Sequence, residues 1–175
     1  MCTRSLLALL MLAAASAVAE PLGIGSAPDP ALLGAWDIDV APDGAGLPPG
    51  RGSVTDGRRI YTERCAVCHG AQGEGGPMDR LAGGHGSLAS DKPVRTVGSF
   101  WPYATTLFDY IRRAMPFNAP QTLGADDLYA VTAYILYLND IVADGATLDA
   151  RSLPQVRMPN RNGFVADPRP DVSGR

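Results

Sequence analysis

The stretch that decides the fold of this chain is Cys65-Ala66-Val67-Cys68-His69, in which two cysteines separated by two residues are followed directly by a histidine. A CxxC pair suits four kinds of site: a thioredoxin-like redox pair, half of a zinc site, a structural disulfide and an attachment site for haem. A redox pair does not require the histidine, and a zinc site needs a second pair of ligands. The complete motif therefore favours haem attachment.

The spacing of this motif matches the chemistry of a covalently bound haem. Two thiols on one helical turn can each form a thioether with one vinyl group of the porphyrin. His69 then lies under the iron with its imidazole available as an axial ligand. The only other residues of these two types are Cys2 and His85. We therefore expect one covalent haem c, anchored by Cys65 and Cys68, with His69 bound to its iron.

The second axial ligand decides whether a haem protein carries electrons or performs catalysis. Met115 is the candidate, because Pro116 ends the preceding helix and disfavours helical conformation at the residue before it. Met115 is thus expected on an extended loop from which its sulfur can reach the iron. Met158, Met78 and His85 are rival ligands. A thioether opposite an imidazole leaves no open coordination site, which is typical of an electron carrier.

Length and composition exclude several classes of protein. The chain has 175 residues, of which 46% are apolar and 19% charged, and a net charge of −3. The apolar share is too high for a charged disordered protein, and nucleic-acid binders are usually basic. The 20 glycines and 15 prolines predict long loops around a single small domain. No nucleic-acid partner is expected.

The first residues have the pattern of a secretory signal peptide, assigned to 1–19. Arg4 precedes an apolar run at 6–15, which is shorter than the ~20 residues of a membrane span. The small residues Ala17 and Ala19 fit a cleavage site. The alternative is an uncleaved N-terminal anchor. We expect a periplasmic protein with no membrane span after cleavage.

The rest of the chain is expected to form a helical domain between two irregular arms. Repeated Pro and Gly predict an extended N-terminal arm at 20–52, with strand-like alternation only at 36–40. A haem domain follows at 53–140. The Pro-rich tail at 141–175 is expected to be either a strap over that domain or disordered.

Three helices are expected in the haem domain. The first begins at Ser53 or Thr55, either of which can cap it, and runs into the haem motif. Apolar residues at spacings of three and four predict a second helix at about 105–114. The third runs from a Thr122 cap to about Leu138. Its predicted buried stripe consists of Leu128, Val131, Ile135 and Leu138.

A glycine-rich stretch at 70–98 predicts a loop around the haem rather than regular structure. Within it, Pro77 or a neighbour could offer a backbone carbonyl to the outer nitrogen of His69. Such a hydrogen bond fixes the orientation of an imidazole ligand.

Several of these features together resemble the class I cytochromes c. The resemblance rests on the CxxCH motif, the Gly-rich run at 73–77, the Met115-Pro116 loop and the final helix at 128–138. In that family the first and last helices cross through a small residue and aromatic contacts, which match Gly57, Tyr61 and Tyr134 by motif. The resemblance implies an all-α class I cytochrome c fold, with three or more helices around one covalently bound haem.

Longer runs look like the cytochrome subunit of bacterial sulfite or sulfane dehydrogenases, the SoxD and SorB type. The runs are 35–40, 46–50, 96–107, 111–117 and 158–161, and the likeness covers nearly all of 31–172. In that family the cytochrome accepts electrons from a molybdenum-cofactor subunit that oxidises a sulfur substrate. By the family's pattern His69 and Met115 are the axial ligands, and Trp101 lies near the haem propionates.

The chain departs from that family in two places. Many SoxD chains carry two haem domains, whereas this sequence has a single CxxCH, which favours the single-haem sulfite-dehydrogenase arrangement or a shortened SoxD. The family's Pro-Xaa-Leu run appears here as the longer stretch 77–81. The carbonyl partner of His69 therefore stays open, and so does the choice of sulfite, thiosulfate or a protein-bound sulfane as substrate.

Three functions are compatible with these features. The first is an electron-transfer subunit of a molybdenum sulfur-oxidising enzyme, which passes electrons to a downstream cytochrome or oxidase. The second is a diffusible cytochrome c, although a free shuttle needs no long arms. The third is a catalytic haem, as in a peroxidase or a thiosulfate-oxidising cytochrome, which requires an open or unusual sixth ligand. Four cationic residues predict a docking rim at the haem edge or contacts with the propionates: Lys92, Arg95, Arg112 and Arg113.

Overall fold

The computed structural model describes residues 22–169, so the predicted signal peptide at 1–19 lies outside the described residues. The chain divides into two units, one ending at Asp37 and one beginning at Ile38. Within the described residues, no helix combines the length and the hydropathy that crossing a bilayer would require.

The first unit contains a short helix that the sequence analysis did not predict. Helix α2 spans Pro30–Trp36, and the side chain of its N-cap residue Asp29 accepts a hydrogen bond from the Ala31 N–H at 2.8 Å. Asp followed by Pro is a helix start signal, because the side chain caps the helix while proline fits its first turn. The expectation of coil with a strand-like 36–40 was therefore wrong here. No residue of α2 is buried.

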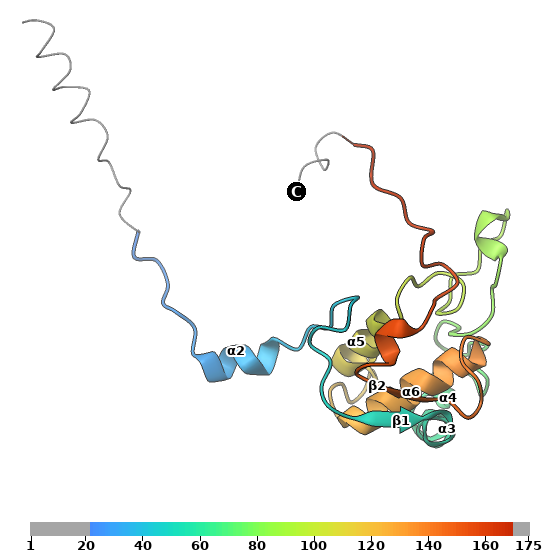
Figure 1. Cartoon of the computed structure of the whole chain (residues 1–175), viewed down its shortest axis with the longest axis horizontal. Coiled ribbons are helices and arrows are strands. Elements are labelled where there is room, and N and C mark those ends of the chain that lie inside the picture. Colours follow the sequence, from blue (N-terminus) through green and yellow to red (C-terminus); the bar gives the residue numbers. More distant parts are fainter. Residues whose placement is uncertain (1–21, 170–175) are drawn as a thin grey trace, which may run out of the picture. The chain divides into compact units, whose positions relative to one another are not determined.

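The described residues of the second unit, 38–169, form four α-helices and one small sheet (Figure 1). The helices are α3 Val54–Arg64, α4 Ala66–His69, α5 Ala104–Ala114 and α6 Ala125–Leu138. The strands are β1 Arg51–Ser53 and β2 Thr147–Asp149, and the short 3₁₀ turns are η2 Ser87–Ala89 and η3 Leu153–Gln155. The expected all-α architecture is confirmed, with this short sheet as an addition.

The N-terminal end of α3 is capped as the sequence predicted. The Ser53 hydroxyl accepts a hydrogen bond from the Asp56 N–H at 3.1 Å, which satisfies one of the free donors of the first turn. The start of α6 differs from the prediction. Gly124 is its N-cap residue, while Thr122 donates a hydrogen bond to the Ala119 carbonyl in the preceding turn. Thr122 is used there because a hydroxyl competes well for nearby backbone groups in turns.

The core lies where α3 crosses α6, with α5 packed beside them. Phe108 of α5 and Tyr129 of α6 are fully buried, and their ring centroids are 4.7 Å apart. The predicted stripe of α6 is confirmed at Leu128, Val131 and Ile135, whereas Leu138 is half-buried.

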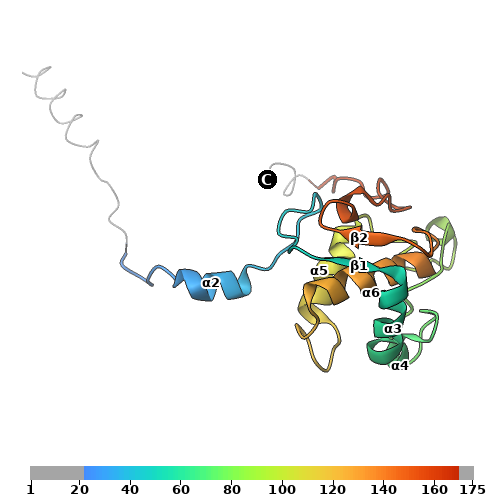
Figure 2. The ribbon, with the colours of Figure 1, turned by 60° about the horizontal axis from the view of Figure 1, so that its bottom comes forward.

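The C-terminal segment from β2 to Arg161 is a strap that packs on the helical domain. Strands β1 and β2 pair antiparallel, with Gly52 opposite Leu148 (Figure 2). Further along, Leu153 and Met158 are both buried in the core. Of the two alternatives for this tail, the strap describes the chain as far as Arg161, whereas residues 162–169 are exposed and form no helix or strand.

Candidate haem site

The two thiols of the CxxCH motif lie on one turn at the end of α3 and in α4. The Cys65 N–H donates to the Tyr61 carbonyl at 2.8 Å, and the His69 N–H donates to the Cys65 carbonyl at 3.0 Å. Both cysteines are free thiols in this structure, and burial raises the pKa of Cys65 to about 11. The motif thus presents two unpaired sulfurs on one helical turn, as attachment to two vinyl groups requires.

His69 is oriented by a backbone carbonyl, as expected, but the carbonyl is that of Asp79 and not that of Pro77. The distance from His69 Nδ1 to the Asp79 oxygen is 2.7 Å. Since a carbonyl can only accept, Nδ1 carries the proton and Nε2 keeps the lone pair that an iron ion needs.

The reason for the shift from Pro77 lies in how the following loop is attached to the motif. The Met78 N–H donates to the Cys68 carbonyl at 3.0 Å, and the Gly76 N–H donates to the Met78 carbonyl at 3.0 Å. These two bonds enclose Pro77 in a tight turn. The turn fixes the backbone on both sides of Pro77, and the carbonyl that meets His69 beyond it is that of Asp79.

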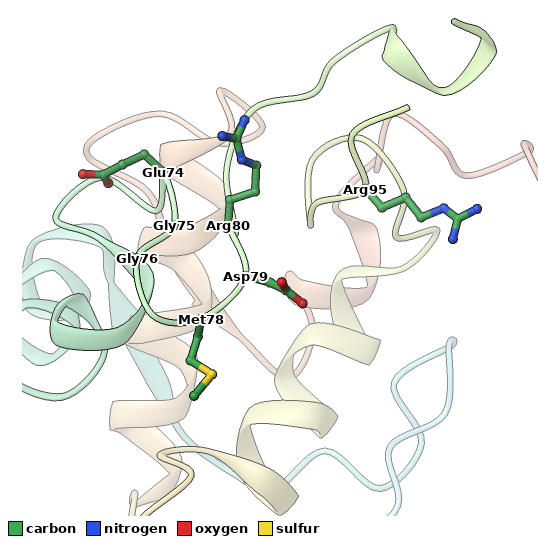
Figure 3. A pocket seen from close by; sticks show the side chains of 7 residues that line it. All are labelled: Glu74, Gly75, Gly76, Met78, Asp79, Arg80 and Arg95. Atoms are coloured by element: carbon green, nitrogen blue, oxygen red, sulfur yellow. The ribbon is translucent and has the colours of Figure 1, made fainter. Parts of the chain in front are cut away.

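An open depression of about 560 Å³ lies along this loop (Figure 3). Its lining residues are Glu74, Gly75, Gly76, Met78, Asp79, Arg80 and Arg95. Figure 3 shows the side chains of Met78 and Arg80 on opposite sides of the loop. Met78 is 52% exposed and its backbone is bonded to Cys68, so this rival ligand belongs to the same loop that holds His69.

Met115 has the local structure predicted for it. It is the C-cap residue of α5 with φ −122° and ψ 147°, which is extended backbone. Its side chain is half-buried against the core cluster. Met158, by contrast, is 3% exposed and belongs to the core itself, and His85 lies in a glycine-rich loop at residues 83–86. Met115 thus differs from these two rival ligands, because it follows a helix directly, has an extended backbone and is partly accessible.

Trp101 lies in a loop that the C-terminal strap holds in place. Its ring packs edge-on against Tyr110 of α5 at 5.8 Å between centroids. In addition, Asn160 donates to the Phe100 carbonyl at 2.7 Å, and the Arg161 guanidinium lies 4.3 Å from the centre of the Tyr103 ring. The strap therefore gives the Trp101 loop a fixed position.

Asn139 is a structural anchor that the sequence analysis missed. It is 1% exposed, and its amide donates to the Leu81 carbonyl at 3.1 Å and to the Ile135 carbonyl at 2.9 Å. Its side-chain oxygen accepts from the Gly83 N–H at 3.2 Å. Asn139 thus ties the end of α6 to the loop that supplies the Asp79 carbonyl. An asparagine directly after an apolar helix was the signal available in the sequence.

The four cationic residues expected at a docking rim do not act alike. Arg112 and Arg113 bind backbone and carboxylate groups of the segment at 38–46, so these two side chains serve a contact within the chain. Arg95 lines the depression and its guanidinium lies 5.4 Å from the centre of the Phe100 ring. The predicted rim is thus reduced to Lys92 and Arg95.

The described residues fit a covalent haem group by their donor chemistry: two free thiols, an imidazole with a free Nε2 and a partly accessible thioether. The family model of cytochrome c matches residues 54–139. A chain in the crystal structure of the sulfane dehydrogenase SoxCD from Paracoccus pantotrophus is 47% identical, with a TM-score of 0.80. That match covers 85% of this chain and 74% of that chain. The chain belongs to the cytochrome c family.

This cytochrome is also similar to a thiosulfate dehydrogenase of Psychrobacter arcticus, with 28% identity over 106 residues. The matched region is 57% of this chain and 31% of the relative, so the cytochrome spans about a third of that curated protein's length. The class I cytochrome c fold expected from the sequence is confirmed by the family and structural matches. The cytochrome binds haem c covalently, with Cys65 and Cys68 as the CxxCH thiols.

Proposed function

We propose that this cytochrome is the periplasmic haem subunit of a sulfur-oxidising dehydrogenase, accepting electrons from a molybdenum-cofactor subunit and passing them to a downstream cytochrome or oxidase. The observation that carries the proposal is the match to the SoxCD structure. The family model stops at 54–139, whereas that match covers 85% of the chain. The likeness therefore extends beyond the haem domain, into sequence that a free shuttle does not need.

The proposal assigns a role to each residue of the site. When bound, the haem supplies a one-electron iron couple. Cys65 and Cys68 would anchor it, and His69 Nε2 and the Met115 sulfur would bind its iron. The Asp79 carbonyl keeps His69 in one orientation and one tautomer. With two protein groups bound to the iron, the haem would serve electron transfer and would leave no open site for a substrate at the metal.

The ligand assignment is tested by ferric spectra of the holoprotein. A ~695 nm band is expected in wild type, since it reports iron bonded to methionine sulfur. Met115→Ala is expected to lose the band, while the matched variant Met78→Leu keeps it. A high-spin or CO-binding wild type would overturn the carrier assignment.

Helix α2 is the feature that favours a subunit over a diffusible cytochrome. Leu32, Leu33 and Trp36 are 59%, 48% and 79% exposed on one short helix outside the haem unit. Clustered exposed apolar side chains are typical of a surface that another protein covers. We assign this surface to the molybdenum subunit.

Copurification tests that assignment. Co-expressed with a tagged molybdenum subunit, wild type is expected to copurify and to be reduced on adding sulfite or a sulfane donor. Leu33→Ser/Trp36→Ser is expected to lose copurification by at least tenfold. Val165→Ser, a loss of an exposed apolar side chain in the C-terminal tail beyond the strap, is expected to keep it. Equal behaviour of the two variants would contradict the assignment.

A catalytic haem is the second candidate, because one relative is named as a thiosulfate dehydrogenase. Such a role needs an open or unusual sixth ligand. Within the described residues the cysteines are Cys65 and Cys68, both in the attachment motif. Thiosulfate oxidation by the isolated holoprotein would support this candidate, and its absence alongside the ~695 nm band supports the carrier.

A further inference from the structure

Two stretches of sequence that lie outside the haem motif contact each other in the structure. The run 36–40 leads into the haem unit, and the run 111–117 contains Met115. Arg113 of the second run pairs with Asp39 of the first at 3.0 Å, although 74 positions separate them in the sequence. The segment before the haem domain therefore contacts the helix turn that precedes Met115.

Asp109 is the centre of this contact. It is only 7% exposed, and its carboxylate accepts a hydrogen bond from the Val40 N–H at 3.0 Å and pairs with Arg113 one turn further along α5. Arg113 thus joins the buried carboxylate of Asp109 to the exposed carboxylate of Asp39. A buried carboxylate with two partners is costly to disturb, because loss of Arg113 leaves its charge unpaired and loss of the Val40 N–H leaves an oxygen without a donor.

Arg112 adds a second attachment from the same turn. Its guanidinium donates to the Ile38 carbonyl at 3.0 Å and to the Gly46 carbonyl at 3.4 Å. Gly46 adopts φ +87°, and a Cβ there would lie 2.0 Å from the Asp39 carbonyl oxygen. The segment is therefore closed into a compact turn that presents fixed acceptors to α5.

These contacts hold the last turn of α5, at residues 111–114. The last turn of a helix lacks partners for its carbonyl groups and frays readily. Met115 follows that turn directly, and its N–H donates to the Ile111 carbonyl at 3.0 Å. Any fraying of residues 111–114 would move the sulfur.

We propose that Asp109 and Arg113 are positioning residues for Met115: by fastening the last turn of α5 to the segment 38–46, they set how readily the methionine sulfur leaves the iron. The inference rests on the proposed function, which makes Met115 the distal ligand. It adds that the contact between the two runs controls the stability of that ligation.

The experiment measures cyanide binding to the ferric holoprotein, since cyanide enters only when the methionine leaves. Asp109→Asn keeps the shape of the side chain and removes its charge. It is expected to bind cyanide at least tenfold faster than wild type and to lose at least half of the ~695 nm absorbance. Arg113→Gln is expected to behave like Asp109→Asn. Arg113→Lys is expected to bind cyanide at a rate between those of Arg113→Gln and wild type, because lysine keeps the positive charge but lacks the paired N–H donors of the guanidinium.

The control is Asp144→Asn, which breaks an ion pair of similar length, 2.9 Å to Arg58, on α3. It is expected to leave cyanide binding within twofold of wild type. Denaturant midpoints of all variants separate loosened ligation from general destabilisation. Should Asp109→Asn not fold, Arg113→Gln, whose side chain is 49% exposed, still carries the test.

The experiment distinguishes failure of the positioning role from failure of the proposed function. A wild type without the ~695 nm band would remove Met115 as the ligand and with it the proposed function. A wild type with the band, together with wild-type cyanide rates in Asp109→Asn and Arg113→Gln, would overturn the positioning role alone. Faster binding in Asp144→Asn to the same extent would also overturn it.

Discussion

A Cβ atom on Gly57 would lie 1.9 Å from the carbonyl oxygen of Ala130, so the backbones of α3 and α6 touch directly where the two helices cross. One turn along α3, Tyr61 packs against Tyr134 with ring centroids 5.2 Å apart. The Tyr61 hydroxyl also donates to the Gly70 carbonyl at 2.9 Å. The crossing therefore positions the end of the haem attachment segment.

Gly57→Ala is expected to lower the free energy of unfolding by about 3 kcal/mol, because backbone atoms cannot move aside as a flexible side chain can. Gly145→Ala, at a glycine with no heavy atom within 4 Å of a built Cβ, is the matched control. It is expected to change stability by less than about 0.5 kcal/mol. Denaturant unfolding of the holoproteins measures both, and similar losses would show that the crossing tolerates a methyl group.

Asn139→Ala is expected to loosen the loop that orients His69. The substitution removes the hydrogen bonds to the Leu81 and Ile135 carbonyls and leaves buried groups without partners. We expect a loss of about 3 kcal/mol in unfolding free energy and faster hydrogen exchange at residues 79–83. Unchanged exchange there would mean that the loop is held by other contacts.

Met158→Ala tests whether Met158 packs in the core or binds the haem iron. Met158 is 3% exposed, so its removal leaves a cavity and is expected to cost about 2–5 kcal/mol. The ~695 nm band is nevertheless expected to stay, since the sulfur packs in the core. Loss of the band with intact folding would make Met158 the ligand.

Tyr129→Phe is expected to reduce the loss of stability at high pH. Burial raises the pKa of Tyr129 from its ordinary 10.0 to about 12. The pKa of Tyr129 is higher in the folded than in the unfolded state, so its neutral hydroxyl stabilises the folded protein. This stabilisation is complete below pH 10.0 and is lost as the pH rises toward about 12. The variant also loses the hydrogen bond to the Pro48 carbonyl, at a cost of about 1 kcal/mol at neutral pH. Denaturant midpoints across this range test it, and parallel curves for both proteins would contradict it.

Features that depend on neighbouring residues could be predicted from the sequence. The Ser53 cap, the extended backbone at Met115 and the helices near 105–114 and 125–138 follow from local chemistry. The start of α6 was misplaced because Thr122 and Gly124 offer similar local signals. Helix α2 was missed because surrounding Pro and Gly outweighed a short cap signal at Asp29.

The sequence by itself determined the covalent chemistry: Cys65, Cys68 and His69 act through their spacing on one turn, which no distant contact has to arrange. Tertiary structure alone decided which carbonyl meets His69, since that depends on how the loop at 76–79 folds back on Cys68. It also decided the partner of Arg113, because an ion pair between positions 74 apart leaves no periodic trace in the sequence. Local spacing sets the covalent attachment of the haem, and long-range packing sets which groups face His69 and the end of α5.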